Sequence, residues 1–376
     1  MNVVVIGGLH HNTLGVIRSL AEKKEIEKIE TLIVAKDFSD NNIISKSKYV
    51  APGNLSYVDS YKQIVPWLIN RGNDGTKNII ICCSDGSAIQ VMKHKNLLCD
   101  KYYLPETTVD IRELASKEVQ AAYAKKCGLS IPDSMVLHKG EKCEWRTFPC
   151  IVKPLKSVIG AGKADIFIAK NDEELKCFLN EVKAEDVQIQ KYMIKEIEYQ
   201  LIGCSLDAGK QIIIPGFTNI LRQPENTNTG YLRYSPISVF DYDKKSVETF
   251  IREIGYSGLF SIEFVRAEDG VDYFLEINLR NDGNAYCVTS AGINLPYIWC
   301  YYSLNKIIPK DEKVEFHSPI MFIPDFSDLL RGIKTVGMCT WIKQFIKAES
   351  HSIWNRKDIK PFFVALFGLV KRFMGK

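Results

Sequence analysis

One short stretch of the sequence contains two strand-like runs and predicts how they pair. Two strand-like runs, SIEFV and DYFLEIN, flank the dipeptide Asp269-Gly270. Asp-Gly between two such runs is a strong signal for a two-residue β-hairpin turn. With this turn, the residue pairs count outward until Glu263 lies directly opposite Glu276. The sequence therefore predicts two carboxylates facing each other across one hairpin.

The predicted hairpin has a polar and an apolar face, because strand side chains alternate. Asn278 shares the face of the two glutamates, and the opposite face carries Ile262, Phe264, Leu275 and Ile277. Opposed carboxylates about 5 Å apart repel by about 3 kcal/mol at an effective dielectric of about 20, whereas a favourable cross-strand pair contributes only about 0.2 to 1 kcal/mol. We therefore expect a bound cation, and this ligand set suits Mg²⁺, with Mn²⁺ as a substitute. The competing interpretation is a different register with a solvated face.

The N-terminal part of the chain alternates apolar runs with a helical pattern. The runs are residues 2–6, 31–35 and 78–83, with Leu14, Ile17, Leu20 and Ile26 at helical spacing between the first two. This alternation predicts a small parallel α/β domain. Gly8 and His10 follow the first predicted strand, where such folds bind ligands. The G-x-G-x-x-G spacing of a dinucleotide site is absent, so we interpret this loop as a substrate-side loop in preference to a nicotinamide site.

A lysine ends another predicted strand just before a glycine-containing loop. Lys153 terminates the run FPCIVK, and residues 157–163 (SVIGAGK) follow it. A lone lysine at a strand end can simply reach solvent. A loop with Gly160 and Gly162, however, can close backbone N–H groups over a phosphate whose charge the lysine neutralises. It is not a Walker loop, because Ala164 follows the Gly-Lys pair where that motif requires Ser or Thr.

Taken in order, these features resemble the ATP-grasp superfamily. The order is a small α/β domain, a helix that begins with Lys117 and ends before Gly128, the strand with Lys153 and its loop, and the hairpin motif Glu…Glu-x-Asn-x-Arg. The resemblance covers residues 1–310 and implies an α/β ATP-grasp fold with an N-terminal Rossmann-like pre-ATP-grasp domain and a basic, helical C-terminal tail. The implied domains are 1–110, 111–310 (small lobe 125–193, large lobe 194–310) and 311–376.

The resemblance also implies roles for individual residues. ATP would be bound by Lys117, Lys153, Ser157, Gly160, Gly162, Gln190, Lys191, Tyr192, Met193 and Glu198, with adenine on the backbone of the 190–193 hinge and the ribose on Glu198. Mg²⁺ would be bound by Glu263, Glu276 and Asn278, and Arg280 would stabilise an acyl phosphate. Many members have an acidic residue where Lys191 stands, which weakens the adenine assignment, and Leu279 replaces a common proline.

The reaction that the resemblance implies is ATP-dependent activation of a carboxylate as an acyl phosphate, followed by transfer to an amine. The run from Glu276 to Asn284 looks closest to D-aspartate-ligase-like and carbamoyl-phosphate-synthase-like short members, the former acting on cell-surface polymer precursors. Arg222 and Arg233 flank a polar loop and are candidates for binding the substrate carboxylate, with an exposed salt bridge as an equal alternative for each. Carboxylase-like or kinase-like chemistry, or a non-catalytic membrane-associated nucleotide-binding module, are the alternatives.

Charge separates the C-terminal tail from the rest of the chain. Ten Lys and Arg residues but only two acids lie between Leu330 and Lys376, although the whole chain has a net charge of only +4. The mildly acidic body argues against a nucleic-acid partner. The eleven cysteines include no C-x-x-C pair, and the N-terminus has no basic leader. We therefore expect reduced thiols and a cytoplasmic protein.

The end of the tail has an amphipathic pattern at helical spacing. Its apolar positions are Phe363, Leu366, Phe367, Val370, Phe373 and Met374, with Lys371, Arg372 and Lys376 on or beside that face. The apolar run is far shorter than the roughly 20 residues that span a bilayer. We expect residues 359–376 either to bind the inner face of an anionic membrane, which would give access to a lipid-linked precursor, or to pack on the catalytic lobes.

Overall fold

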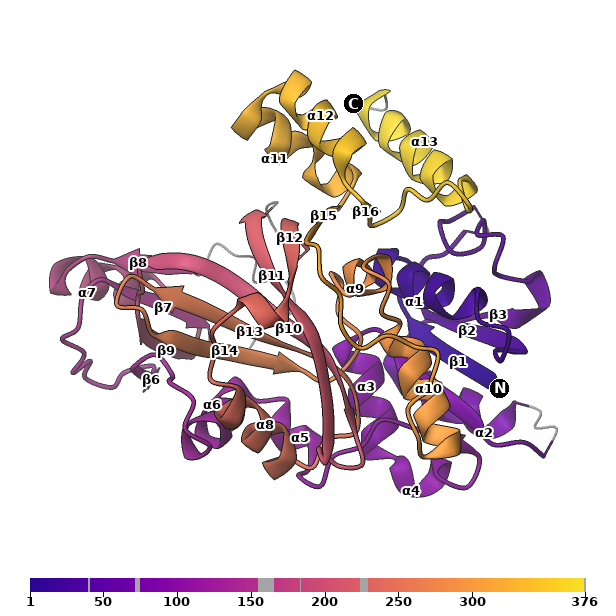
Figure 1. Ribbon diagram of the computed structural model, residues 1–376. Coiled ribbons are helices and arrows are strands. Elements are labelled where there is room, and N and C mark those ends of the chain that lie inside the picture. The colour runs from indigo at the N-terminus through magenta and orange to yellow at the C-terminus, as the bar shows by residue number, and fades with distance from the viewer. Residues whose placement is uncertain (40, 72–74, 155–165, 183, 224–228, 375–376) are drawn as a thin grey trace.

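The computed structural model describes residues 1–376 except 40, 72–74, 155–165, 183, 224–228 and 375–376. Its N-terminal sheet is parallel, in the order β3-β2-β1-β4-β5 (Figure 1). The strands are β1 (Asn2–Gly7), β2 (Lys28–Val34), β3 (Leu55–Val58), β4 (Asn78–Cys82) and β5 (Tyr102–Tyr103). The connecting helices are α1 (His11–Ala21), α2 (Ile64–Asn70), α3 (Asp85–Lys93) and α4 (Lys95–Leu98), with 3₁₀ turns at Pro52–Asn54 and Tyr61–Gln63.

Side chains of β1 are buried on both faces of this sheet. Val3 and Val5 belong to one apolar cluster with α1 and α10 (Leu295–Asn305), and Val4 and Ile6 belong to another with α2 and α3. Strands buried on both faces have continuous apolar runs, which is why the sequence predicts β1, β2 and β4. It does not predict the short strands β3 and β5.

The direction in which the chain adds parallel strands reverses between β1 and β4. After β1 the chain continues to β2 and β3 on one side, whereas β4 is followed by β5 on the other. The carboxyl ends of two such neighbouring strands border the crevice where open α/β sheets bind ligands. The residues that directly follow Gly7 and Cys82 are therefore candidates for ligand binding.

A four-stranded antiparallel sheet lies at the end of the molecule far from the parallel sheet (Figure 1). In the order β6-β9-β7-β8 it contains β6 (Ser134–His138), β7 (Cys150–Pro154), β8 (Phe167–Ala169) and β9 (Asp186–Lys191), with α7 (Asp172–Glu181) packed on it. The helices α5 (Ile111–Leu114) and α6 (Lys117–Lys126) precede it. As predicted, α6 ends just before Gly128, whose φ of +95° is a left-handed conformation that suits glycine.

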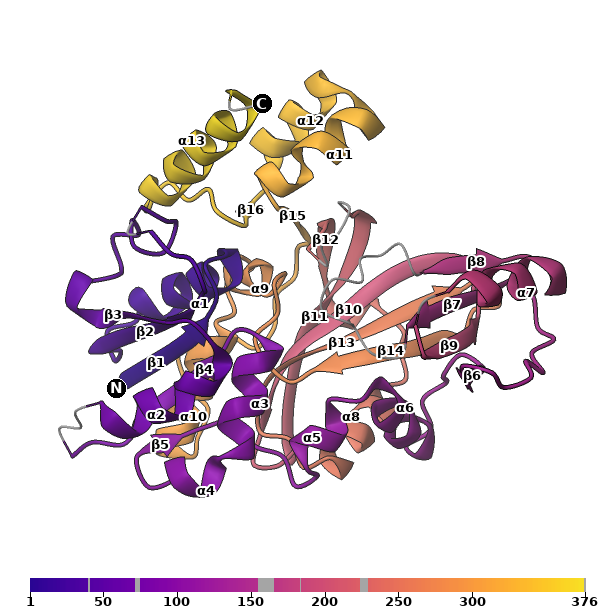
Figure 2. The ribbon, with the colours of Figure 1, turned by 180° about the vertical axis from the view of Figure 1, so that it is seen from behind.

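A seven-stranded sheet in the order β14-β13-β10-β11-β12-β15-β16 occupies the middle of the molecule. Its strands are β10 (Lys195–Leu206), β11 (Gln211–Arg222), β12 (Tyr231–Pro236), β13 (Gly258–Ala267), β14 (Asp272–Asn278), β15 (Ile320–Ile323) and β16 (Ser350–His351). The associated helices are α8 (Lys244–Glu253), α9 (Tyr286–Ser290), α10 and a 3₁₀ turn at Ile237–Val239. Seen from either side, α6 and α8 lie below this sheet, and α10 lies between it and the parallel sheet (Figures 1 and 2). The α/β class predicted from the sequence is confirmed.

The β13–β14 hairpin pairs Glu263 with Glu276 as predicted, but through a different register. The turn is longer than predicted, because Gly270 N–H donates to Ala267 O and Ala267 N–H donates to Val271 O. Gly270 is left-handed at φ +76°, as in a three-residue hairpin loop. The pairs next to the turn are therefore displaced by one residue, and a β-bulge at residue 275 restores the predicted pairing beyond it.

This bulge changes which side chain enters the core. Phe274 pairs with Phe264 and is buried against it, whereas Leu275 is only partly buried and lines a cavity. The prediction that Leu275 faces the core is therefore wrong. Bulges commonly redirect side chains next to functional sites, and here the bulge precedes Glu276 directly.

The C-terminal region contributes β15 and β16 to the central sheet, and its helices, two between these strands and one after them, form a separate group (Figure 1). These are α11 (Phe326–Val336), α12 (Met338–Lys347) and α13 (Lys360–Met374). The predicted helical character of the tail is confirmed. A buried ion pair between Arg18 of α1 and Asp358 connects this region to the parallel sheet.

Candidate active site

The two opposed glutamates and Asn278 lie together on one face of the β13–β14 hairpin. Glu263 Oε1 accepts hydrogen bonds from Gln200 Nε2 at 3.0 Å and from Asn278 Nδ2 at 3.3 Å. Gln200 lies on the neighbouring strand β10, directly opposite Glu263. Two side-chain amides therefore fix the orientation of the carboxylate that faces Glu276.

The charge environment of Glu263 favours a bound cation. Burial, followed by the neighbouring carboxylates of Glu276 and Asp282, raises the pKa of Glu263 to about 8. A positive ion would relieve both effects. The two carboxylates fit Mg²⁺, and the Asn278 amide beside them turns its Nδ2 toward Glu263 while its Oδ1 accepts a hydrogen bond from Arg280. No group of three or more His, Cys, Asp and Glu side chains in the described ranges is arranged to hold a metal ion. Substrate oxygens and water would complete the coordination shell of a Mg²⁺ ion bound here.

Two lysines approach the glutamates from different elements. Lys117, the first residue of α6, forms an ion pair with Glu276. Lys153 of β7 donates to Gln190 Oε1 at 2.8 Å. Desolvation, followed by the charge of Lys117, lowers the pKa of Lys153 to about 8. The charge of Lys117 thus disfavours the charged form of Lys153, and a bound polyphosphate would relieve this effect.

A cavity of about 210 Å³ joins these groups. Its lining includes Lys117, Lys153, Gln188, Gln190, Glu263 and Glu276. The structure thus brings predicted phosphate and metal residues from α6, β7, β9 and the hairpin to one place. Ser157, Gly160 and Gly162, which we expect to close over phosphate, lie outside the described residues.

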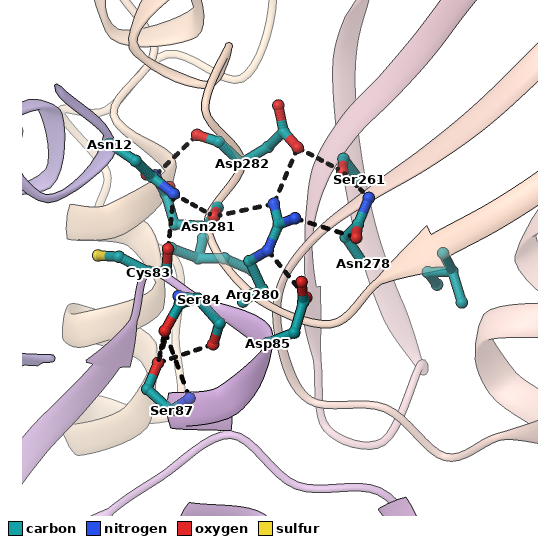
Figure 3. A network of polar contacts seen from close by, with 12 residues as sticks. Asn12, Cys83, Ser84, Asp85, Ser87, Ser261, Asn278, Arg280, Asn281 and Asp282 are labelled. Carbon is teal, nitrogen blue, oxygen red and sulfur yellow. Dashed lines mark hydrogen bonds and ion pairs between the residues drawn. The ribbon is translucent and has the colours of Figure 1, made fainter. Parts of the chain in front are cut away.

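Arg280 is held among three acceptor side chains (Figure 3). Its Nε donates to Asp85 Oδ1 at 3.0 Å, its Nη1 to Asp282 Oδ2 at 2.9 Å and its Nη2 to Asn278 Oδ1 at 3.0 Å. Asp282 is buried and also accepts a hydrogen bond from the Ser261 hydroxyl at 3.0 Å. The Asp85 side chain, in contrast, is 64% exposed. The guanidinium is therefore fixed beside Asn278, with one solvent-accessible partner.

Hydrogen bonds join the segment that carries Arg280 to residues beside the crevice between β1 and β4. Asn12 Nδ2 donates to Cys83 O at 2.9 Å and to Asn281 O at 2.8 Å (Figure 3). Asn281 N–H donates to Cys82 O at 3.0 Å. The hairpin residues therefore meet the parallel sheet at the point where such sheets bind ligands.

The predicted adenine hinge has contacts of its own. The N–H groups of Lys191 and Tyr192 donate to backbone carbonyls of other segments, so these two amides are not available to adenine in this structure. Met193 is partly buried. Glu198, predicted to bind the ribose, is paired with Lys195. The structure places these residues near the end of β9 and the start of β10 but does not test their roles.

The two candidate arginines of the polar loop have different environments. Arg222 is buried and donates to both carboxylate oxygens of Asp328 on α11 and to Gln344 Oε1 on α12. This geometry supports the ion-pair interpretation of Arg222 over a substrate contact, and the pair is buried where we expected an exposed one. Arg233 is exposed on β12, between Asn219 of β11 and Met321 of β15.

The loop after β1 caps the N-terminus of α1. His10 is the N-cap of α1, and its Nδ1 accepts a hydrogen bond from Asn12 N–H at 3.2 Å. A Cβ added at Gly8 would lie 3.2 Å from the His10 ring. The next residue, His11, is hydrogen-bonded to Thr229 Oγ1 at 3.2 Å. Capping of α1 therefore explains His10 without a substrate, although the loop borders the crevice as predicted.

Sequence reasoning missed several polar residues of this site, namely Gln200, Ser261, Asp282 and Asp85. Asp85 could have been found, because Ser84-Asp85 directly follows a buried parallel strand, where ligand-binding residues concentrate. Asp282 belongs to the polar run after Glu276, but nothing in that run indicates its contact with Arg280. Gln200 has no sequence signal, because its contact with Glu263 depends on strand pairing.

Comparison with known sequences gives a partial match. No family model matches the sequence. The chain is 23% identical over 244 residues to a D-aspartate ligase of Enterococcus faecium (strain Aus0004). The match covers 58% of this chain and 57% of the relative, so it spans little more than half of that protein.

Several solved structures are similar over most of the chain. An ADP complex of N5-carboxyaminoimidazole ribonucleotide synthetase has a TM-score of 0.65 at 12% identity and covers 89% of this chain and 84% of that chain. An N5-carboxyaminoimidazole synthetase from Staphylococcus aureus has a TM-score of 0.62 at 17% identity, covering 88% and 84%. An L-amino acid ligase from Bacillus licheniformis has a TM-score of 0.57 at 12% identity, covering 81% and 74%. At these identities the similarity defines the fold.

Proposed function

The chain has the ATP-grasp fold, and from this premise we propose that it is an ATP- and Mg²⁺-dependent ligase that activates a carboxylate as an acyl phosphate and joins it to an amine. The observation that carries the proposal is the convergence of Lys117, Lys153, Glu263 and Glu276 on one cavity. The sequence resemblance to the ATP-grasp superfamily is confirmed at the level of the fold.

In the proposed first step, the protein binds and orients the phosphates. Phosphoryl transfer needs positioned positive charge more than covalent participation by the protein. Lys117 and Lys153 would bind phosphate oxygens, and the anion would restore the full charge of Lys153. Glu263, Glu276 and Asn278 would hold Mg²⁺, which when bound neutralises charge on the phosphates.

In the proposed second step, an amine attacks the acyl phosphate. A free carboxylate does not react with an amine, because its leaving group would be an oxide ion, and phosphorylation supplies a better one. Arg280 lies beside Asn278 with its guanidinium fixed by Asp282. It would stabilise the negative oxygen of the tetrahedral intermediate from a position set before the reaction begins.

An amino acid is the first candidate for the carboxylate substrate, because a D-aspartate ligase and an L-amino acid ligase are among the similar proteins. Attachment to a cell-surface polymer precursor is the finer part of this proposal and rests on the D-aspartate-ligase-like run from Glu276 to Asn284. The similarity to N5-carboxyaminoimidazole synthetases keeps other ATP-grasp chemistry as the alternative.

We also propose a cytoplasmic location and the domains 1–110, 111–310 and 311–376.

The proposal predicts the products of ATP cleavage. With D-aspartate and other amino acids supplied one at a time, we expect ADP and phosphate to appear only with an accepted carboxylate. Hydroxylamine should convert the acyl phosphate to a hydroxamate, which is measured by its iron complex. Release of AMP and pyrophosphate would indicate adenylation and contradict the mechanism.

The C-terminal helix has features of a reversible membrane contact, which we propose as the route to a lipid-linked precursor. On α13, Phe363 is 44%, Phe367 64% and Met374 74% exposed, whereas Phe362 packs on Phe326. Most of the predicted apolar face is thus directed away from the body. No helix in the described part of the chain is long and apolar enough to span a bilayer.

We predict that the protein sediments with liposomes that contain anionic lipid at low salt, and that deletion of residues 359–376 abolishes this binding. The expectation follows because each basic residue near an anionic surface contributes about 1 kcal/mol and the exposed aromatic side chains add burial. Phe363→Ser with Phe367→Ser should weaken binding, whereas Leu97→Ser, which changes an exposed side chain of α4, should not. Binding that survives the deletion would contradict the proposal.

A further inference from the structure

A second cavity adjoins the proposed phosphate site. Its volume is about 240 Å³, and it lies between the start of α3, α5, the start of α6 and the end of β14. Lys117 and Glu276 line both this cavity and the phosphate cavity. A small molecule bound here would therefore lie next to a phosphoryl group bound in the neighbouring cavity.

The lining combines apolar walls with a pair of opposite charges. The apolar part includes Ala88, Ile89, Leu114 and Leu279. Asp85 and Arg280 also line the cavity, and Arg280 Nε binds one oxygen of the Asp85 carboxylate at 3.0 Å. The carboxylate has a second oxygen for another partner, and its side chain is 64% exposed.

We propose that this cavity binds the attacking amine and that the Asp85 carboxylate accepts the proton that the amine loses, a proposal that rests on the ligase function. An exposed carboxylate attracts an ammonium group and repels a carboxylate substrate. The cations Lys117 and Arg280 on the same lining offset the charges of Asp85 and Glu276, so the lining does not hold the amine in its ammonium form and leaves the neutral, nucleophilic form accessible. The cavity therefore suits a small amine, or the amine end of a larger one.

The reaction balances with these groups alone. As the amine nitrogen attacks the acyl carbon, the new N–C bond forms and the nitrogen becomes acidic. Its proton passes to Asp85 and then to solvent. Collapse of the tetrahedral intermediate breaks the bond between the acyl carbon and the bridging phosphate oxygen, and inorganic phosphate leaves with the bonding electrons. Arg280 would stabilise the intermediate and also binds Asp85. It therefore holds the base near the acyl carbon.

The test compares two nucleophiles in wild type and Asp85→Asn. Hydroxylamine is uncharged at neutral pH and reacts without a base, whereas ammonium chloride supplies an amine that must bind and lose a proton and is small enough to enter the cavity. With the amino acid that gives hydroxamate in the wild type, we expect Asp85→Asn to lower amide formation from ammonium at least 100-fold and hydroxamate formation less than threefold. Asp100→Asn, at an exposed position of the same sheet domain, is the matched control and should change neither rate.

Each other outcome has a definite meaning. Equal losses with both nucleophiles in Asp85→Asn would show that Asp85 only positions Arg280, or binds the ammonium group of the amino-acid substrate, and would overturn the inference. Hydroxamate without any amide from ammonium in the wild type would also overturn it while leaving the ligase function intact. No hydroxamate with any amino acid or other carboxylate supplied would instead remove the proposed function and the inference with it.

Discussion

Replacing Glu276 by glutamine is expected to lower ATP turnover by roughly 1,000-fold or more and to leave the protein as stable as the wild type or slightly more stable. The variant loses one of the two carboxylates that would hold Mg²⁺, which explains the loss of activity. It also removes a negative charge that raises the pKa of Glu263. The lost ion pair with Lys117 costs little, because the lysine is 67% exposed.

The experiment measures ADP release and thermal unfolding on the same preparations. Glu268→Gln is the matched control, because it makes the same chemical change at the exposed tip of the same hairpin and should alter neither quantity. Near-normal turnover of Glu276→Gln with Mg²⁺ would show that the opposed pair is not the metal site. A large loss of stability would instead assign Glu276 a structural role through Lys117.

The hairpin shows which structural features local sequence rules predict and which they do not. The Asp-Gly signal predicted which two glutamates face each other, but the predicted pairing holds only because the bulge at residue 275 compensates for the longer turn. It did not predict the longer turn or the compensating bulge, so it placed Leu275 in the core instead of Phe274. The choice between these side chains depends on packing against Phe264 and Phe250, which no local rule contains.

The polar partners of the site depend on contacts between distant segments. Asp85 reaches Arg280 from the start of α3, and Asn12 bridges Cys83 and Asn281. These contacts exist only after the chain has folded, and the sequence therefore indicated the motif residues but not their neighbours. The partner of Arg222 was not predicted for a related reason. This partner, Asp328, lies in the C-terminal helices, and no sequence motif indicated that these helices contact the polar loop.

Glu263 is expected to make the stability of the metal-free protein depend on pH. In an unfolded chain a glutamate titrates at about pH 4.3, whereas burial and the neighbouring carboxylates raise the pKa of Glu263 to about 8 in the folded protein. Between these values the folded protein holds a proton that the unfolded chain has released. The contribution of this group to stability is therefore fully present below about pH 4 and is lost as the pH rises to about 8.

The difference between wild type and Glu263→Gln isolates this effect, because the other titrating groups are common to both proteins. We expect similar free energies of unfolding in urea at pH 5, where Glu263 is protonated and resembles glutamine. At pH 8 without metal the variant should be more stable by roughly 2 to 4 kcal/mol. Added Mg²⁺ should stabilise the wild type at pH 8 more than the variant, because the ion takes the place of the proton. If the two proteins instead kept a constant difference from pH 5 to pH 8, Glu263 would ionise normally, and the electrostatic argument for a cation between the glutamates would fail.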